Sequence, residues 1–428
     1  MPNHSTTRTP AHSFRLSQLA RTRGRLVRAT CLLTLLLGCS AGAGEQLSEE
    51  EEAAKVAEAK QTLKELHASH ELPALWAARY DLVKGGEPMQ KREFVYGVRK
   101  LSADPASQSA MFTDKVHLGS CTKAMTGLLI AQLVSTDPQF DWNTTLANAL
   151  PEHESLQGSP WADIKIIDIL HHRGGLPANA PWHIHEREFP DDVVAARAAV
   201  VDWLVKQKTP KKPTYLYSNT GYALLGHILE SKSGESWEEI IAKRLFQPLG
   251  IQSAGFGPPT RPDTRGSDGG TSSDSSQPFG HHTQPGVASA LMSLFSKKSA
   301  ALAPVEIDNA RPLGPAGRVH MRISDWAKFL QLFLHESAPE QIKGLKNADW
   351  QMLQDTGDDG TYAGGWIVTE RGWAGGKALT HSGSNTTWHC VVWLAPKRDF
   401  LVLAVTNCHK EDAATALDST VAELIRRF

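Results

Sequence analysis

Ser120 and Lys123 stand three residues apart, where the strand-like segment 115–118 meets an apolar run over 124–134. On a helix this spacing places the hydroxyl and the amine on one face, and the amides of the first turn remain free. The pair suits an activated serine nucleophile, because the lysine can accept the proton and a backbone NH can bind an oxyanion. On its own the pattern is weak, since a capping serine followed by a solvated lysine is much the more common reading of such a match.

A second candidate is Tyr217-x-Asn219, where an extended segment enters a helix. A tyrosine with an ordinary pKa of about 10 acts as a base only where positive charge favours the phenolate. Lys123 could supply that charge, or could itself be the base if burial lowers its pKa. The Asn219 amide could hold a substrate carbonyl or position Lys123. Taken alone, the pair also fits a core tyrosine before a helix cap.

A third candidate is His381-x-Gly383-Ser384, at the end of a predicted strand. Gly383 would allow a ligand backbone to approach as an added strand, and the Ser384 amide could be a second oxyanion donor. A lone histidine at a strand end is more often structural.

In this order the three pieces resemble the motifs of the class C β-lactamase and penicillin-binding serine hydrolases, relatives of the set with Lys-Thr-Gly at the third position. The resemblance covers roughly residues 72–428. Beyond the motifs it includes the stretches 116–119, 166–172, 217–230, 245–251, 316–319 and 388–406.

By this resemblance Ser120 is the nucleophile that forms an acyl-enzyme, and Lys123 and Tyr217 share the proton transfers. Asn219 and His381 would orient the substrate, and the amides of Ser120 and Ser384, beside Gly383, would form the oxyanion hole. The departure lies at the third motif, where a mostly neutral histidine replaces a charged lysine. That disfavours efficient hydrolysis of carboxylate-bearing β-lactams and leaves D-amino-acid peptidase and esterase activities open. The alternative is a catalytically weak cell-wall peptide or penicillin-binding protein on the same scaffold.

The composition limits the partners. The formal net charge of −1 over 428 residues gives no footprint for nucleic acid, so we expect a small-molecule or peptide substrate. No cofactor is implied. His183-x-His185 with Glu186, and His281-His282, lack further ligands at suitable spacing, so no metal site is predicted. His171 and His172 are interpreted as shaping a loop.

The first part of the chain is typical of an export signal. Six arginines and no acidic residue lie between Arg8 and Arg28, followed by an apolar segment over 31–37 and by Gly38-Cys39. The residues 36–39 resemble the bacterial lipobox, by which Cys39 is the lipidated mature N-terminus. We therefore expect a signal peptide over 1–38, a tether over 39–48 and the hydrolase domain over 49–428, anchored at the cell envelope on the periplasmic or outer-membrane side. The alternative is a plain secretory signal that ends near a cysteine.

The three remaining cysteines are expected to be free thiols, because an odd count gives no complete disulfide framework. Cys390 and Cys408 lie at unequal distances from the turn 395–399 and should not face each other. Cys121 points about 100° away from Ser120 on a helix, so it is interpreted as a small buried side chain.

The periodicity predicts an α/β fold of the α+β type, an antiparallel sheet flanked by helices with a mainly helical lobe over about 137–336 inserted between N- and C-terminal strands. An amphipathic helix over 48–67 and a hairpin of 74–83 with 93–98 precede that lobe. Ser236 and Ser324 are predicted to cap helices over 237–246 and 325–335. The segment 258–285 is predicted to be a mobile excursion. Strands over 362–368, 377–382, 388–394 and 400–406 and a helix over 413–428 close the chain, with a cleft between the lobes.

Overall fold

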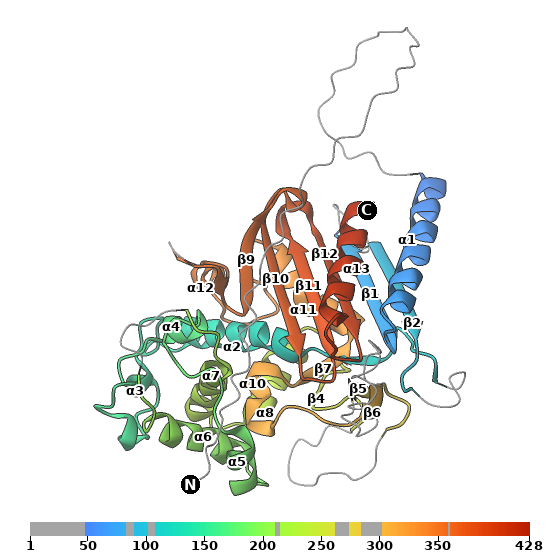
Figure 1. Cartoon of the computed structure of the whole chain (residues 1–428). Coiled ribbons are helices and arrows are strands. Elements are labelled where there is room, and N and C mark those ends of the chain that lie inside the picture. The colour runs from blue at the N-terminus through green and yellow to red at the C-terminus, as the bar shows by residue number, and fades with distance from the viewer. Residues whose placement is uncertain are drawn as a thin grey trace, which may run out of the picture. The chain divides into compact units, whose positions relative to one another are not determined.

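The N- and C-terminal parts of the chain meet in one antiparallel sheet (Figure 1). In the computed structural model its strand order is β2-β1-β12-β11-β10-β9-β8. The central pair joins Trp76 of β1 (Ala74–Asp81) to Val405 of β12 (Phe400–Thr406). The prediction that both ends share a sheet is therefore confirmed. The other strands are β2 (Gln90–Gly97), β8 (Tyr362–Ala363), β9 (Trp366–Arg371), β10 (Gly376–Ser384) and β11 (His389–Ala395).

The structure describes residues 48–82, 90–101, 108–209, 215–261, 274–283, 302–357 and 360–428. Contacts divide the chain after Leu47, and everything described here lies in the second unit. The predicted signal peptide, the lipidation site Cys39 and nearly all of the tether fall outside these residues. So do the turn of the first hairpin and half of the excursion over 258–285.

Both faces of the sheet are covered, which explains why its central strands are apolar throughout. In β1, Trp76 and Tyr80 face the core shared with the helical lobe, whereas Leu75 and Ala77 face the opposite core. That opposite core is closed by α1 (Glu49–Ser69) and α13 (Ala413–Arg427), which pack side by side (Figure 1). The predicted amphipathic helix at the start of the chain is confirmed, with Ser48 as its cap.

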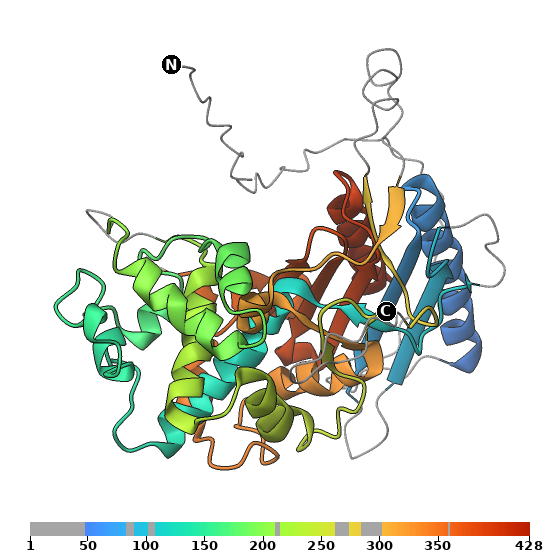
Figure 2. The same ribbon diagram turned by 90° about the horizontal axis from the view of Figure 1, so that it is seen from below.

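The middle of the chain forms the predicted helical lobe on the other side of the sheet (Figure 2). Its central helix is α2 (Thr122–Thr136), buried on nearly every face. The Ser236 cap and its capping box with Glu239 are confirmed. The remaining helical elements are α3 (Leu146–Ala149), η3 (Glu154–Leu156), α4 (Ile166–Leu170), α5 (Trp182–Glu188), α6 (Val193–Leu204), α7 (Asn219–Ser233), α8 (Trp237–Ile241), the π-helical η4 (Ala242–Phe246), η5 (Arg311–Leu313), α10 (Gly314–Gly317), α11 (Ile323–Gln331), η6 (Leu332–Leu334) and α12 (Asn347–Met352).

The strand-like segment 115–118 is confirmed as a short strand, and further short strands occur in the region that the sequence interpretation left helical with loops. β3 (Lys115–His117), β7 (Val319–Arg322) and β4 (Gly255–Phe256) form a small sheet in the order β3-β7-β4. β5 (Gly280–Thr283) pairs with β6 (Leu302–Val305). Strands of two to four residues carry too little alternation to be recognised from sequence.

Two local predictions are wrong. The strand expected over 362–368 is two short strands, β8 and β9, because Gly364 and Gly365 turn with φ of 58° and 95°. A side chain at Gly365 would lie 2.3 Å from the Ala124 amide nitrogen, so α2 requires this glycine turn. Ser324 does not cap its helix, since α11 begins one residue earlier, at Ile323, after Arg322.

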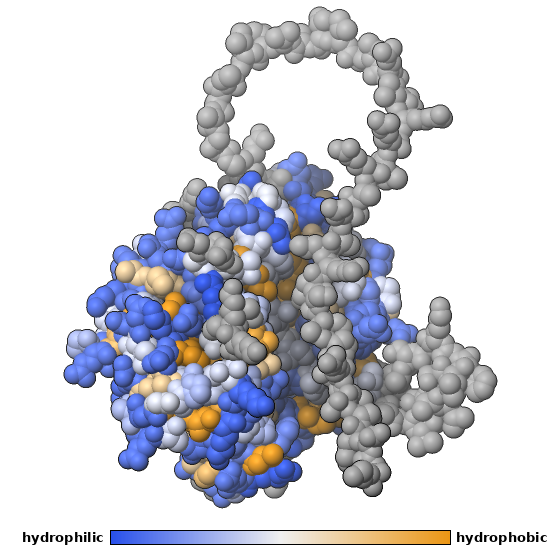
Figure 3. All heavy atoms as spheres, turned by 60° about the vertical axis from the view of Figure 1, so that its left-hand side comes forward, coloured by the Kyte–Doolittle hydropathy of each residue, from blue (hydrophilic) through white to orange (hydrophobic). Residues whose placement is uncertain are grey.

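The three cysteines in the described residues are free and buried, as predicted. In the described part of the chain, no helix is long and apolar enough to cross a membrane. Exposed large hydrophobic side chains are scattered over a mainly hydrophilic surface (Figure 3), and they include Tyr215 at 53% exposure.

Candidate active site

Ser120 lies in the one-turn helix η2 (Gly119–Cys121), immediately before α2. The turn is tight because Gly119 has a φ of 49°, and a side chain there would lie 2.3 Å from the Ser384 amide nitrogen. Only glycine allows this approach. Ser120 is therefore held against the end of β10, and its side chain is only partly buried.

Lys123 is completely buried one turn into the helix. Its Nζ lies 3.2 Å from Ser120 Oγ, 2.7 Å from Asn219 Oδ1 and 2.7 Å from the Ala316 carbonyl oxygen. The structure thus brings together three of the residues predicted from sequence, with a backbone carbonyl that sequence reasoning did not identify.

These contacts determine which way the amine points. The Asn219 and Ala316 oxygens can only accept, so each of them accepts a hydrogen bond from one N–H of the Lys123 amine. A neutral amine has no third hydrogen, and its lone pair then faces the Ser120 hydroxyl. Burial lowers the pKa of Lys123 well below its usual range, which favours the neutral form. This arrangement suits a base that removes the serine proton.

Tyr217 lies on the other side of the same amine, with Lys123 Nζ 4.8 Å from its ring centroid. Its hydroxyl bonds with Ser120, but burial raises the pKa of Tyr217 far above its ordinary value. The phenol is therefore protonated at neutral pH. Of the two possible bases, the geometry and the pKa directions favour Lys123.

His172 holds the segment that carries Tyr217. Its carbonyl accepts from the Leu216 amide at 2.9 Å, and its Nδ1 accepts from the Ser218 amide at 3.1 Å. Its ring centroid lies 4.5 Å from that of Tyr217. The backbone of His172 has a φ of 58°, an uncommon conformation for a residue with a side chain. The prediction that His172 shapes a loop is confirmed, and that loop positions the tyrosine.

His381 lies on β10 and is 4% exposed. Its Nδ1 donates to the Ser382 carbonyl at 2.6 Å, and its Nε2 accepts from the Tyr362 hydroxyl at 3.0 Å. Burial lowers the pKa of His381 to about 3. The side chain is therefore neutral at pH 7. Tyr362 was not singled out from sequence, because a lone tyrosine carries no motif.

The glycine of the third motif has a role within the protein, while its predicted role in the approach of a ligand stays a prediction. A side chain at Gly383 would lie 2.0 Å from the Leu118 carbonyl oxygen, so this glycine admits the chain's own backbone. β10 pairs with β9 from Gly376 to Thr380, and its final residues extend past that ladder. The Ser384 amide nitrogen lies close to Gly119, the residue before Ser120. The oxyanion hole expected from the Ser120 and Ser384 amides stays a prediction.

Asp308 connects the segment before Ser120 with the segment after Ser384. Its Oδ1 accepts from Asn385 Nδ2 at 2.7 Å and lies 3.0 Å from His117 Nε2. The other ring nitrogen of His117 accepts from the Gly119 amide at 3.0 Å. Burial opposes ionisation of this carboxyl, but the nearby His117 and Arg318 hold the pKa of Asp308 at about 2. Sequence reasoning missed Asp308, because its partners lie far away along the chain.

Two of the histidines that were considered as metal ligands, His281 and His183, have other contacts. His281 donates from Nδ1 to the Asn407 carbonyl at 2.9 Å and accepts at Nε2 from the Leu101 amide at 3.0 Å. His183 lies 3.6 Å from Glu186, which also binds Arg311. Both ring nitrogens of His185 are buried without a hydrogen-bond partner. Within the described residues, neither histidine pair belongs to a group of three ligand-type side chains whose ligand atoms converge.

Comparison with known proteins gives the same fold over nearly the whole described unit. The family model Beta-lactamase matches residues 61–426. A β-lactamase from Sulfitobacter sp. EE-36 superposes with a TM-score of 0.64 at 19% identity, covering 89% of this chain and 98% of that one. A D-amino acid amidase from Ochrobactrum anthropi SV3 gives a TM-score of 0.63 at 17% identity, covering 87% and 97%.

Among curated relatives, an unguisins hydrolase from Aspergillus campestris is 24% identical over 328 residues, which are 73% of this chain and 55% of that protein. Penicillin-binding protein 4 from Amycolatopsis lactamdurans is 30% identical over 146 residues, or 34% of this chain and 37% of that protein. The chain spans about half, or less, of the length of these relatives.

Proposed function

We propose that this chain, which belongs to the Beta-lactamase family, is a serine hydrolase that cleaves an amide or ester through an acyl-enzyme on Ser120. The observation that carries this proposal is the contact set of Lys123. Two carbonyl oxygens take its hydrogens, and the lone pair of the neutral amine faces the serine hydroxyl.

In the first step Lys123 accepts the Ser120 proton while Oγ attacks the substrate carbonyl carbon. The amides of Ser120 and Ser384 bind the resulting oxyanion. The C–N or C–O bond then breaks, and the leaving group takes a proton that Tyr217 donates from its hydroxyl and recovers from Lys123. Water attacks the ester on Ser120, passing its proton back through the same groups, and releases the acid.

The surroundings of the site favour a substrate without a carboxylate next to His381. That side chain is neutral and already bonded to Tyr362, so it offers no positive charge. Tyr215 is half exposed, and its ring centroid lies 6.4 Å from that of Tyr362, which provides an aromatic surface at the site. We therefore favour amides or esters of D-amino acids with apolar side chains. The D-amino acid amidase that shares this fold supports this class.

The test is hydrolysis of a matched panel by the full chain and by Ser120→Ala. The panel contains D- and L-phenylalanine amides, their methyl esters, p-nitrophenyl acetate and a chromogenic cephalosporin. We expect turnover of a D-amide or ester that falls by at least about 10⁴-fold in Ser120→Ala. If no amide or ester turns over but penicillin remains bound, the chain is a penicillin-binding protein without useful catalysis.

We also propose export and lipid anchoring through Cys39, on the sequence features of residues 8–39. Expression of the full chain in a Gram-negative host should place it in the membrane fraction, and Cys39→Ala should release it. Equal partitioning of both forms would contradict the anchor.

A further inference from the structure

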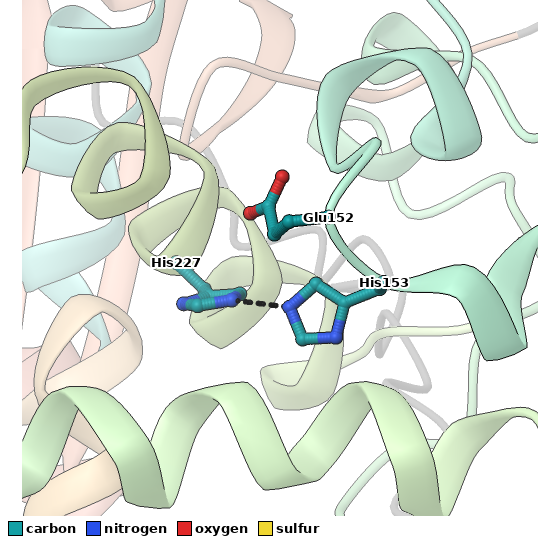
Figure 4. Close-up of side chains that lie close together, drawn as sticks. All are labelled: Glu152, His153 and His227. Atoms are coloured by element: carbon teal, nitrogen blue, oxygen red, sulfur yellow. Dashed lines mark hydrogen bonds between the residues drawn. The ribbon is translucent and has the colours of Figure 1, made fainter.

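A second group of ligand-type side chains lies between the middle of α7 and the segment before η3, away from Ser120. Glu152, His153 and His227 each offer one ligand atom, and these atoms all lie within 4.8 Å of one another (Figure 4). Glu152 and His153 come from the segment between α3 and η3, and His227 comes from the middle of α7. His227 is eight residues beyond Asn219, which is about 12 Å along the helix axis.

The two imidazoles face each other through nitrogens. His153 Nε2 lies 2.9 Å from His227 Nε2. His227 is 5% exposed, and its other nitrogen, Nδ1, lies 3.4 Å from a Glu230 carboxylate oxygen. Because a carboxylate only accepts, Nδ1 carries the hydrogen, and the Nε2 lone pair of His227 points into the group.

Glu230 is fixed as a carboxylate. Its Oε1 accepts from Arg197 Nε at 2.9 Å and from the Trp237 amide at 2.9 Å. A histidine whose far nitrogen donates to a fixed carboxylate is the usual arrangement behind a metal ligand, because the partner sets the tautomer and orients the ring.

The third side chain, Glu152, has a charge and a position that suit a metal ligand. The Glu152 carboxyl bonds to the hydroxyl of Ser231, which is four residues beyond His227 on the same face of α7. The group therefore offers an anionic oxygen and two imidazole nitrogens.

We propose that Glu152, His153 and His227 bind one divalent cation of the zinc type, with water completing a four-coordinate site. Two histidines and a carboxylate are a set that suits zinc. Tetrahedral zinc with N ligands at 2.0–2.1 Å needs the two nitrogens about 3.3 Å apart, so the rings must separate by about 0.4 Å. The ion would fasten the segment before η3 to the helix whose first turn carries Asn219. Its role is structural, because the serine mechanism uses no metal.

The competing explanation is an ordinary hydrogen bond in which His153 Nε2 donates its proton to His227. Both explanations fit a 2.9 Å separation, but they predict different results when zinc is added. Only the metal site links binding to His153, Glu152 and His227 together.

The experiment measures zinc and cobalt binding by the full chain after removal of metal with a chelator. Isothermal titration should give one zinc per chain, and Co²⁺ should give the visible d–d absorption of a four-coordinate site. Saturating zinc should raise Tm by roughly 3–6 °C. His153→Ala is the main variant because this side chain is only partly buried, and Glu152→Gln is the second. Each should weaken zinc binding by at least about 100-fold.

His183→Ala is the matched control, because His183 is 76% exposed beside Glu186 but lies outside the group. It should bind zinc as the wild type does. Absence of zinc binding, or equal binding by the wild type and His153→Ala, would overturn the proposal and leave the hydrogen-bonded pair. Loss of binding in His183→Ala as well would also overturn it, since it would indicate nonspecific histidine binding.

Discussion

Two polar groups, one at the first turn of α7 and one beside its middle, differ in how their polar atoms are paired within the protein. At the first turn, Asn219 helps to fix Lys123, and each hydrogen and lone pair of the neutral amine has a partner within the protein. Two turns later, the facing nitrogens of His153 and His227 lie beside the Glu152 carboxylate. The first group needs nothing added to hold a proton acceptor against Ser120. A bound cation would give the facing nitrogens and the carboxylate of the second group a common partner. We therefore assign the second group to metal binding and the first to catalysis.

Substitutions in the group around Lys123 should have the largest effect on kcat. Lys123→Met keeps the length and apolar stem but removes the base, so kcat on an amide or ester should fall by about 10⁴-fold. Tyr217→Phe keeps the ring beside His172 and should lower kcat by about 10²-fold. Steady-state kinetics on the best substrate of the panel measures both.

The control for these two variants is Lys243→Met, which removes an exposed lysine of η4 that pairs with Glu235. It should keep wild-type kinetics. If Lys123→Met retained a tenth of the wild-type kcat, Lys123 would not be the base and Tyr217 would have to be reconsidered.

Weakening the support of the oxyanion hole should have an intermediate effect. Asp308→Asn keeps the shape of the side chain but removes the charge that holds His117 and Asn385. We expect kcat to fall by up to about 10²-fold with little change in KM, because the two oxyanion amides shift relative to Ser120. A change confined to Tm would show that Asp308 only stabilises the fold.

The smallest effect is expected on the pH dependence of kcat/KM in the His381 variant. This profile distinguishes Lys123, the proposed base, from the neighbouring His381. Lys123 accepts a proton only when neutral, and burial lowers its pKa, so kcat/KM on a neutral ester should be kept as pH rises and lost as pH falls through that lowered value. His381, with its pKa lowered to about 3, stays neutral between pH 5 and 8. His381→Gln should therefore leave the acidic limb in place. Disappearance of that limb would identify His381 as the titrating group.

The sequence predicted what depends on short spacing. Ser120 and Lys123 share one helical turn, and the central strands of the large sheet have clear apolar patterns, so nucleophile, base and sheet could all be located. The motifs also located Asn219 and the end of β10. Their spacing within each motif reflects one local turn or strand end.

The features that the sequence could not predict depend on contacts between distant segments. His153 and His227 are 74 residues apart, and Asp308 lies almost 200 residues from His117, so neither pair leaves a local pattern. The packing role of Gly383 could not be predicted, because the carbonyl that approaches it belongs to the distant Leu118. The turn at Gly364-Gly365 was missed because it is imposed by the packing of α2.

Whether Ser120 is the nucleophile can be read from the intact mass of the full chain after brief exposure to a penicillin and to an activated ester, with Ser120→Ala treated in parallel. We predict an added acyl group on the wild type from the ester, placed on Ser120 by peptide mapping, and none on the variant. With the penicillin, a long-lived adduct would indicate a penicillin-binding protein, whereas a short-lived adduct would indicate hydrolysis. An acyl group carried equally by Ser120→Ala, or no adduct together with no turnover of any ester, would contradict the assignment of Ser120 as the nucleophile.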